Sequence, residues 1–268
     1  MLEEKSIISY KELFYLYYRV TKSDKKIKAG EYQFDKKTSL YKVIKNFHNN
    51  DLIYRKITIP ECYTVEKTLA LLKSNQYIIG DVLKIPKEGT LFPDTYYYLR
   101  NDNINSLLIR MKDRMVNKIK EVKGINFKYL KSNNDLLILA SLIEAEAKFI
   151  EEKYLVSSVF HNRLKNNMKL QSDPTILYGK NLLTKLKTKK IYKEDLKKDH
   201  PWNTYTRKGM PLTPICNPGL EAIKAAANPY ITNYLYFVSD GQGGHRFSKN
   251  LDQHNKNVKI WKRIKNEK

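Results

Sequence analysis

The stretch Leu137-Ile138-Leu139-Ala140-Ser141-Leu142-Ile143-Glu144-Ala145-Glu146-Ala147 carries the strongest structural signal in this chain of 268 residues. It lies within 133–167, a run without Gly or Pro, and its apolar residues predict a long helix over 134–166. Two carboxylates, Glu144 and Glu146, stand inside this apolar segment. Burial would raise the pKa of either one, as a general acid that works near neutral pH requires.

The two carboxylates differ in their neighbours on the predicted helix. With about 100° between successive residues, Glu144 shares its face with small side chains such as Ala140, Ser141 and Ala147, which leave room for a bulky substrate. Glu146 projects among large apolar side chains, so desolvation alone favours it as the acid. The helix pattern leaves the choice open, and it equally allows that both are partly exposed residues paired with Lys.

Shorter elements flank this run, and together they predict an α+β fold. Helical spacing and N-cap residues indicate further helices, and alternating or β-rich runs indicate short strands. The expected helices cover 10–20, 39–47, 64–73 and 103–122, and the expected strands cover 29–34, 56–60 and 234–238. Because Ile85-Pro86 interrupts the pattern, we expect two parts, 1–86 and 87–268.

The composition is that of a folded protein with a strong positive charge. Hydrophobic residues make up 41% of the chain, charged residues 29%, and the net charge is +22. Such a charge favours a polyanionic partner: nucleic acid, an anionic membrane or an acidic polymer. The lysines are scattered, however, without the dense basic and aromatic clusters of a nucleic-acid face, so we expect no nucleic-acid partner.

Several other classes of protein are disfavoured by missing motifs. Cys62 and Cys216 are far apart and suggest neither a disulfide framework nor a zinc site. His245 has no metal-ligand spacing around it, and the glycine-rich segment 240–247 lacks the phosphate-binding pattern, so no metal or cofactor is expected. The apolar stretch 7–20 is short and interrupted by charges, so it predicts neither a signal peptide nor a membrane span.

A series of short motifs resembles the YceG-like endolytic murein transglycosylases. The first is Glu88-Gly89-Thr90-Leu91-Phe92-Pro93-Asp94-Thr95-Tyr96. The others follow in the family's order at 140–144, 158–164, 170–175, 203–205, 214–219, 225–227, 234–238 and 243–247, with His254-Asn255 beyond them. The resemblance is close from residue 88 to about 262. It implies a small LysM-like module, in part, over 1–86 and a helix-rich YceG-like catalytic domain with a short sheet over 87–268.

The resemblance also implies a reaction and an acid. The family's catalytic glutamate falls on Glu144 in Ala140-Ser141-Leu142-Ile143-Glu144, whereas Glu146 has no comparable role there. The expected activity is that of a lyase that cuts the bond between N-acetylmuramic acid and N-acetylglucosamine in nascent strands. One glutamate can serve twice, first as acid at the glycosidic oxygen and then as base at the C6 hydroxyl, which closes a 1,6-anhydro ring.

Polar and aromatic loop residues are the candidates for substrate binding, because rigid loops commonly hold ligand-contacting side chains. The predicted set is Gln171, Asp173, Thr175, Asn203, Tyr205, His245, Glu88, Asp94 and Tyr96. For each of the loop residues, a role in building the loop is the alternative. The sequence departs from the family pattern at Ala145, where relatives often carry Lys, at Ala147, where they carry Thr, and at Leu212, where Pro is frequent.

The resemblance extends to partners and location. We expect peptidoglycan glycan strands as substrate, peptidoglycan synthases as protein partners, and a place at the periplasmic face of the bacterial inner membrane. The sequence predicts an N-terminally shortened member without the family's membrane anchor. Two alternatives stay open: a peptidoglycan-binding relic that has lost activity, and a basic nucleic-acid-binding protein.

Overall fold

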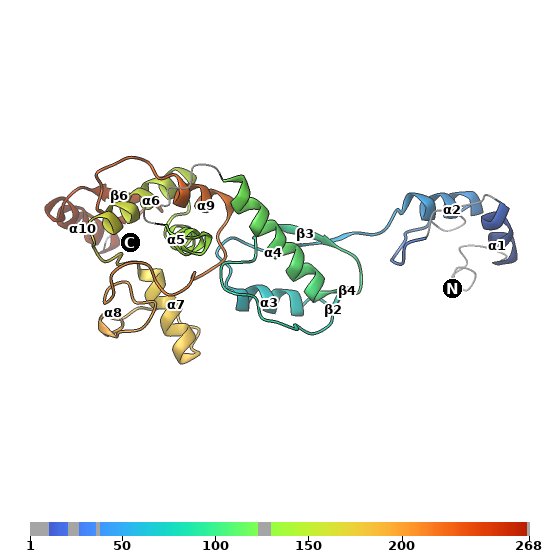
Figure 1. Cartoon of the computed structure of the whole chain (residues 1–268), viewed down its shortest axis with the longest axis horizontal. Helices are drawn as coiled ribbons and strands as arrows, with labels where there is room; N and C mark the ends of the chain where they lie inside the picture. The colour runs from blue at the N-terminus through green and yellow to red at the C-terminus, as the bar shows by residue number, and fades with distance from the viewer. Residues whose placement is uncertain (1–10, 21–26, 36–37, 123–129, 267–268) are drawn as a thin grey trace.

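The computed structural model describes residues 11–20, 27–35, 38–122 and 130–266 (Figure 1). The helices are α1 (Lys11–Val20), α2 (Leu40–Asn49), α3 (Val65–Lys73), α4 (Ile104–Glu121), α5 (Asn133–Glu146), α6 (Ile150–Lys165), α7 (Asp173–Thr184), α8 (Lys193–Lys197), α9 (Leu220–Ala227) and α10 (Leu251–Asn266). The strands are β1 (Arg55–Thr58), β2 (Ile78–Ile79), β3 (Thr95–Tyr98), β4 (Asp102–Asn103), β5 (Tyr236–Ser239) and β6 (His245–Ser248). In this part of the chain none of the helices is long and apolar enough to span a membrane.

The strands form small separate sheets, so the predicted α+β class is confirmed and the protein is mostly helical. β1 pairs with β3 and β5 with β6, both antiparallel, whereas β2 pairs with β4 in parallel. The predicted strand over 29–34 is wrong, because this segment makes only an isolated bridge between Tyr32 and Leu52. The LysM-like module is not shown by the described residues: α1 and α2 lie at one end of the molecule, joined to the rest by an extended segment (Figure 1).

The N-terminal ends of two helices follow directly from their capping residues. Ser39 precedes α2 and accepts a hydrogen bond from the Lys42 amide at 3.3 Å. Thr64 precedes α3 and accepts one from the Lys67 amide at 3.2 Å. Each side chain satisfies an amide that the helix itself leaves without a partner. Both predicted caps are confirmed.

The predicted continuous helix over 134–166 is wrong, since the chain breaks between α5 and α6. Ala147 and Phe149 both adopt extended backbone conformations, although neither Gly nor Pro is present. Helix propensity is a weak preference that tertiary packing overrides. Here α5 is buried on all sides and α6 packs back against it and against α9, so packing places the break where the local sequence contains no signal.

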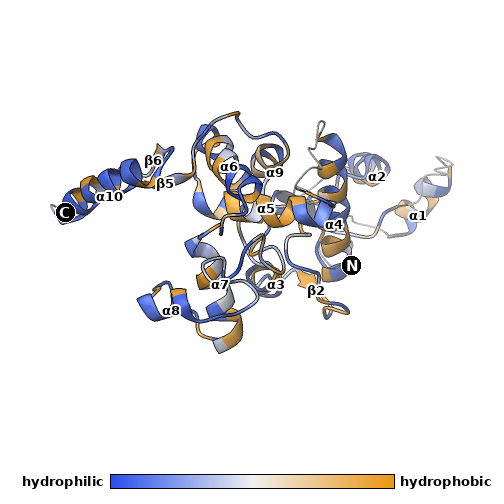
Figure 2. Ribbon diagram, turned by 60° about the vertical axis from the view of Figure 1, so that its left-hand side comes forward, coloured by the Kyte–Doolittle hydropathy of each residue, from blue (hydrophilic) through white to orange (hydrophobic). Residues whose placement is uncertain are grey.

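The larger hydrophobic core surrounds α5, which packs against α6, α7 and α9. Figure 2 shows the hydrophobic colouring concentrated on α5 in the interior, in contrast to the hydrophilic surface of α10. Buried polar groups join α6 to α9: Ser157 donates to the Ala225 carbonyl at 2.6 Å, and His161 Nε2 lies 2.9 Å from the Ala226 carbonyl. Burial lowers the pKa of His161, so this contact is made by a neutral ring.

A second core lies between α3, α4 and the β1–β3 pair. Its fully enclosed members include Leu72, Leu91, Leu107 and Met111. The domain limits 1–86 and 87–268 stay a prediction. Both the β1–β3 ladder and this core contain residues from either side of residue 86.

Cys62 and Cys216 form a disulfide, although the sequence suggested no disulfide framework. The two residues are 154 positions apart in sequence, yet their Cα atoms are 4.8 Å apart. The bond joins the turn after β1 to the loop before α9, and the Cys62 amide also donates to the Asn217 carbonyl at 2.9 Å. Sequence separation conceals such pairs, because only the fold brings the two turns together.

Candidate active site

Glu144 lies in the last turn of α5, and its side chain is only 5% exposed. Its Oε1 accepts a hydrogen bond from Lys153 Nζ at 2.6 Å, and its Oε2 accepts one from the Gly219 amide at 2.9 Å. Burial raises the pKa of this carboxyl, while the lysine ammonium and the amide oppose the rise, and the net direction is upward. The arrangement therefore suits a group that must both hold and release a proton.

Lys153 belongs to the first turn of α6, and its side chain is 4% exposed. The break between α5 and α6 turns this residue back toward Glu144. Its ammonium also lies 3.4 Å from Oε2 of Glu61, which follows β1 and whose side chain is 52% exposed. A single ammonium thus stands between a buried carboxylate and a half-exposed one, each from a different segment.

Gly219 brings the N-terminus of α9 to this group. As the N-cap residue it donates its amide to Glu144, where the positive end of the helix dipole favours a negative charge. A Cβ atom at Gly219 would overlap the carboxylate of Glu61. The missing side chain therefore allows Glu61 and the α9 terminus to approach each other closely.

Glu146, the other candidate acid, makes its contacts in a different direction. Ser172, just before α7, donates its hydroxyl to Glu146 Oε1 at 2.5 Å. Although the residue as a whole is partly accessible, its carboxyl group lies among protein atoms, and this burial raises its pKa to about 7. The negative charge of Asp173 acts in the same direction. The structure thus places the two carboxylates of the helix in separate polar clusters.

The N-terminus of α7 gathers four of the residues predicted to bind substrate. Tyr205 donates to Asp173 Oδ1 at 2.5 Å, and burial raises the pKa of its phenol. Thr175 is buried, with its hydroxyl 2.9 Å from that of Thr204. The amide of Gln171 donates to the Thr204 carbonyl at 3.1 Å. These contacts form one polar cluster around Glu146.

Arg163 of α6, which sequence reasoning missed, holds this cluster against the β5 segment. Its Nε donates to the Leu235 carbonyl at 2.6 Å, and its Nη1 donates to the Leu170 carbonyl at 3.1 Å and to Gln171 Oε1 at 2.9 Å. The guanidinium is almost fully buried and lies over the ring of Tyr236. Its fixed fork of donors therefore sets the orientation of the Gln171 side chain.

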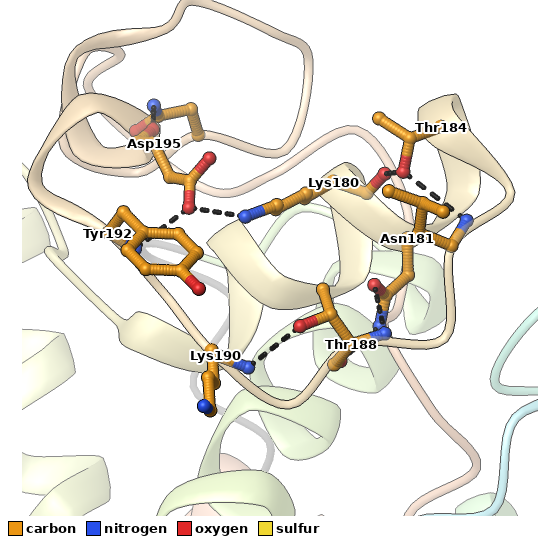
Figure 3. A network of polar contacts seen from close by, with 9 residues as sticks. Lys180, Asn181, Thr184, Thr188, Lys190, Tyr192 and Asp195 are labelled. Atoms are coloured by element: carbon orange, nitrogen blue, oxygen red, sulfur yellow. Dashed lines mark hydrogen bonds and ion pairs between the residues drawn. The ribbon is translucent and has the colours of Figure 1, made fainter.

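Asn203 is buried and serves the loop that carries Tyr205. Its Nδ2 donates to the Lys198 carbonyl at 2.8 Å, and its Oδ1 accepts from the Tyr205 amide at 2.8 Å. Figure 3 shows the neighbouring network that fixes the connection from α7 to α8. There Asp195 accepts from Lys180 Nζ at 2.6 Å and from the Tyr192 amide at 2.8 Å. The side-chain hydrogen bonds of Asn203 to other described residues all hold its own loop together.

The residues from the first motif lie in the N-terminal half of the fold. Glu88 Oε1 accepts from the Val65 amide at the start of α3, at 2.9 Å, and burial raises the Glu88 pKa to about 7. Asp94 pairs with Arg114 of α4. Tyr96 is buried in the second core and donates to the Phe92 carbonyl at 2.7 Å. Among the described contacts of these three predicted residues, none is with Glu144.

His245, at the start of β6, reaches the first turn of α6. Its amide donates to Glu152 Oε1 at 2.7 Å, and its Nδ1 lies 3.0 Å from Glu152 Oε2. Glu152 immediately precedes Lys153, so the β5–β6 hairpin is fastened beside the residue that pairs with Glu144. In the described part of the chain no three His, Cys, Asp or Glu side chains are grouped as a metal site would need.

Comparison with known proteins assigns the chain to a family. The model of the YceG-like family matches residues 1–260. The chain belongs to the YceG-like family.

Relatives and a solved structure agree with this assignment. The endolytic murein transglycosylase of Bacillus subtilis (strain 168) is 40% identical over 187 residues, which is 69% of this YceG-like chain and 51% of the relative. The endolytic murein transglycosylase of Streptococcus pneumoniae (strain R6) is 27% identical over 305 residues. That match covers 96% of this chain and 54% of the relative. The chain thus spans about half the length of the curated relatives it matches.

The crystal structure of a yceG-like protein from Listeria monocytogenes matches with a TM-score of 0.63. The two are 28% identical, and the match covers 95% of this YceG-like chain and 92% of the crystallised one. The family resemblance predicted from the sequence motifs is therefore confirmed, both by sequence and by fold.

The YceG-like motifs indicated Glu144, but they left out the groups that contact it. Gly219 ends the motif at 214–219, so its position was available although its contact was not. Glu61 lies outside the region of close resemblance. Lys153 had no signal at all, because its contact with Glu144 depends on the unpredicted break between α5 and α6.

Proposed function

We propose that this chain is an endolytic lytic transglycosylase, a lyase acting on peptidoglycan. It cuts the bond between N-acetylmuramic acid and N-acetylglucosamine within nascent glycan strands, leaves 1,6-anhydro ends and so terminates strand elongation. The observation that carries the proposal is the buried Glu144 carboxyl, which matches the family's catalytic position and is held by Lys153 and the Gly219 amide. The names of its relatives support the same activity.

In the first step, protonated Glu144 donates its proton to the glycosidic oxygen. The bond from muramic acid C1 to that oxygen breaks, the N-acetylglucosamine side leaves as an alcohol, and positive charge develops at C1 and the ring oxygen. Burial raises the pKa of Glu144, the direction that favours the protonated form this step requires. Acid–base assistance of this kind contributes about 10²–10⁴-fold to the rate.

In the second step, the same residue acts as base. The Glu144 carboxylate takes the proton from the C6 hydroxyl of the muramic acid, and the C6 oxygen bonds to C1, which closes the anhydro ring without water. The proton count balances, because Glu144 regains the proton that it gave. The Lys153 ammonium and the Gly219 amide stabilise the carboxylate between the two steps.

For the substrate, we propose that the glycan strand runs past the cluster at the N-terminus of α7. Asp173, Tyr205 and Gln171 offer polar groups and an aromatic ring on a braced loop. Thr175 and Asn203 are buried, which supports a role in shaping that loop. His245 contacts Glu152 at the start of α6, beside Lys153. Glu88, Asp94 and Tyr96 help to form the N-terminal half of the fold, which also contains the turn of Glu61. Synthases as partners and a place at the periplasmic face of the inner membrane follow from the family and belong to this proposal.

The test compares the parent chain with Glu144→Gln on uncrosslinked glycan strands, with the new ends identified by mass spectrometry. We expect anhydro-muramyl ends from the parent and a loss of about 10²-fold or more in Glu144→Gln. Glu146→Gln is the matched control, since it makes the same change two residues away on the same helix, and it should still produce anhydro ends. Reducing ends would show that water is the acceptor. Strand binding without cleavage would show a peptidoglycan-binding protein without activity. Either result contradicts the proposal.

A further inference from the structure

The Lys153 ammonium faces more negative charge than it can balance. Its Nζ lies 2.6 Å from Glu144 and 3.4 Å from Glu61, and its own side chain is almost fully buried. Only Glu61, about half exposed, can draw on solvent to stabilise an ionised carboxylate. Of the two carboxyl groups, it is therefore the buried one, Glu144, whose neutral form the surroundings favour.

The reaction makes this arrangement necessary. At its start Glu144 carries a proton and is neutral, which would leave the Lys153 ammonium buried without a counter-charge. A buried charge that loses its partner is strongly unfavourable. Without a second anion, the lysine would instead favour the ionised form of Glu144, and the acid would be lost.

We propose, on the basis of the function above, that Glu61 is a positioning residue that supplies the counter-charge of Lys153 while Glu144 holds its proton. When Glu144 has given up the proton, Lys153 is shared between two carboxylates. The group then carries a net negative charge beside the positive charge that develops at C1 of the sugar.

The backbone around Glu61 is fixed although its side chain is partly exposed. Cys62, the next residue, has a left-handed backbone with φ of 56° and is bonded to Cys216. Asn217, directly after Cys216, donates its amide to the Tyr63 carbonyl at 2.9 Å. The carboxylate itself rests against the backbone of Gly219, where no side chain intervenes. These contacts hold Glu61 at the distance from Lys153 that a counter-charge needs.

Few groups affect the pKa of Glu144, so a change in that pKa after substitution of Glu61 can be assigned to the Glu61 charge. Among the described residues, the main ones are Lys153 from α6, Glu61 from the turn after β1, and the Gly219 amide at the start of α9. Lys153 and Gly219 lower the pKa of Glu144, whereas Glu61 raises it. Removal of the Glu61 charge should therefore lower the pKa of Glu144.

The experiment uses Glu61→Gln, which keeps the shape of the side chain and removes its charge. The first measurement is kcat/KM for anhydro-end formation against pH, and the second is a ¹³C NMR titration of the Glu144 carboxyl, assigned by its absence in Glu144→Gln. We expect the basic limb of the rate profile and the Glu144 midpoint to move together to lower pH. At neutral pH the loss in kcat/KM should be on the order of tenfold.

Two further variants separate charge from structure. Glu61→Asp retains the charge, so it should keep the Glu144 midpoint near that of the parent even if activity falls. Glu121→Gln removes a carboxylate of similar exposure (55%) that also binds a lysine, Lys118, and it should change neither profile. The thermal unfolding transition of each variant serves as the control that it is folded.

An unchanged Glu144 midpoint in folded Glu61→Gln would overturn the inference, as would an equal shift in Glu121→Gln. The NMR titration needs no turnover and therefore also decides the role of Glu61 if the parent forms no anhydro ends. The absence of anhydro ends in the parent would count against the proposed function alone.

Discussion

Lys153 Nζ lies 2.6 Å from Glu144 Oε1 although the two residues are nine positions apart along the chain. This contact exists because the chain leaves the helical conformation at Ala147 and resumes it after Phe149. Both side chains are almost fully buried, so the contact is shielded from solvent. The short distance and the burial of both groups make Lys153 the most informative position after Glu144 itself.

Lys153→Met should raise the pKa of Glu144, in contrast to Glu61→Gln, which should lower it. The ammonium lowers the pKa of this carboxyl, and a methionine of similar length removes the charge while filling the space. The basic limb of kcat/KM should therefore move to higher pH. Because the carboxylate formed between the two steps loses its partner, kcat should fall on the order of tenfold or more. Lys118→Met on α4 is the surface control, and a Glu144 midpoint that does not rise would contradict the assignment.

Glu146 should make the stability of the protein fall as pH rises. Its folded-state pKa of about 7 exceeds the ordinary value of 4.5, so the folded state holds a proton that the unfolded state has released between these pH values. The contribution is complete below pH 4.5 and is lost as pH rises through 7, by up to about 3 kcal/mol. Glu146→Gln should flatten this slope in urea unfolding measured from pH 5 to 8.

Glu88, whose pKa is also raised to about 7, adds a slope of the same sign. The Glu146→Gln variant should therefore keep part of the pH dependence, and a second substitution, Glu88→Gln, should remove more of it. A slope in Glu146→Gln as steep as that of the parent would show that the Glu146 carboxyl is not buried as described.

Loss of the Cys62–Cys216 disulfide should lower the free energy of unfolding by about 3–5 kcal/mol, because the bond closes a long loop in the unfolded chain. Guanidinium unfolding with and without reductant measures the difference. The double variant Cys62→Ser/Cys216→Ser is the control, since reductant should not affect it. Full alkylation of both thiols in the native, unreduced protein would contradict the pairing.

Ser141→Ala should destabilise the protein by about 1–3 kcal/mol, because it leaves a buried amide without a partner. Ser141 is fully buried in α5, accepts from the Ile215 amide at 3.0 Å and donates to the Ile138 carbonyl at 2.7 Å. The control is Ser106→Ala, an exposed serine near the start of α4, which should change stability by less than about 0.5 kcal/mol. Equal effects of the two substitutions in chemical denaturation would argue against a structural role for Ser141.

The elements that the sequence predicted correctly are those with local causes. Ser39 and Thr64 begin helices because their hydroxyls cap the nearest amides, and this chemistry is visible within four residues. The apolar run ending near Glu144 is likewise a local pattern, and it forms the buried helix α5. The family motifs pointed to Glu144 as the acid, which stays a prediction, and the family assignment is confirmed.

The features that escaped prediction depend on segments distant in sequence. The Cys62–Cys216 bond, the contact of Glu61 with Lys153 and the Gly219 amide at Glu144 all join positions more than seventy residues apart. No periodicity or spacing records such contacts, because they arise only when the segments pack. The predicted glycan contacts at Asp173 and Tyr205 stay predictions, although the fold does place these two residues together.

The break between α5 and α6 has a consequence for when the pair of Glu144 and Lys153 can form. A free peptide of residues 133–167 would form one uninterrupted helix if its local preferences alone decided. In that helix Glu144 and Lys153 would point to opposite sides and lie about 13 Å apart along the axis. The acid therefore has no partner in an isolated fragment or in a partly assembled chain. Completion of the fold is therefore the step that brings Glu144 and Lys153 together.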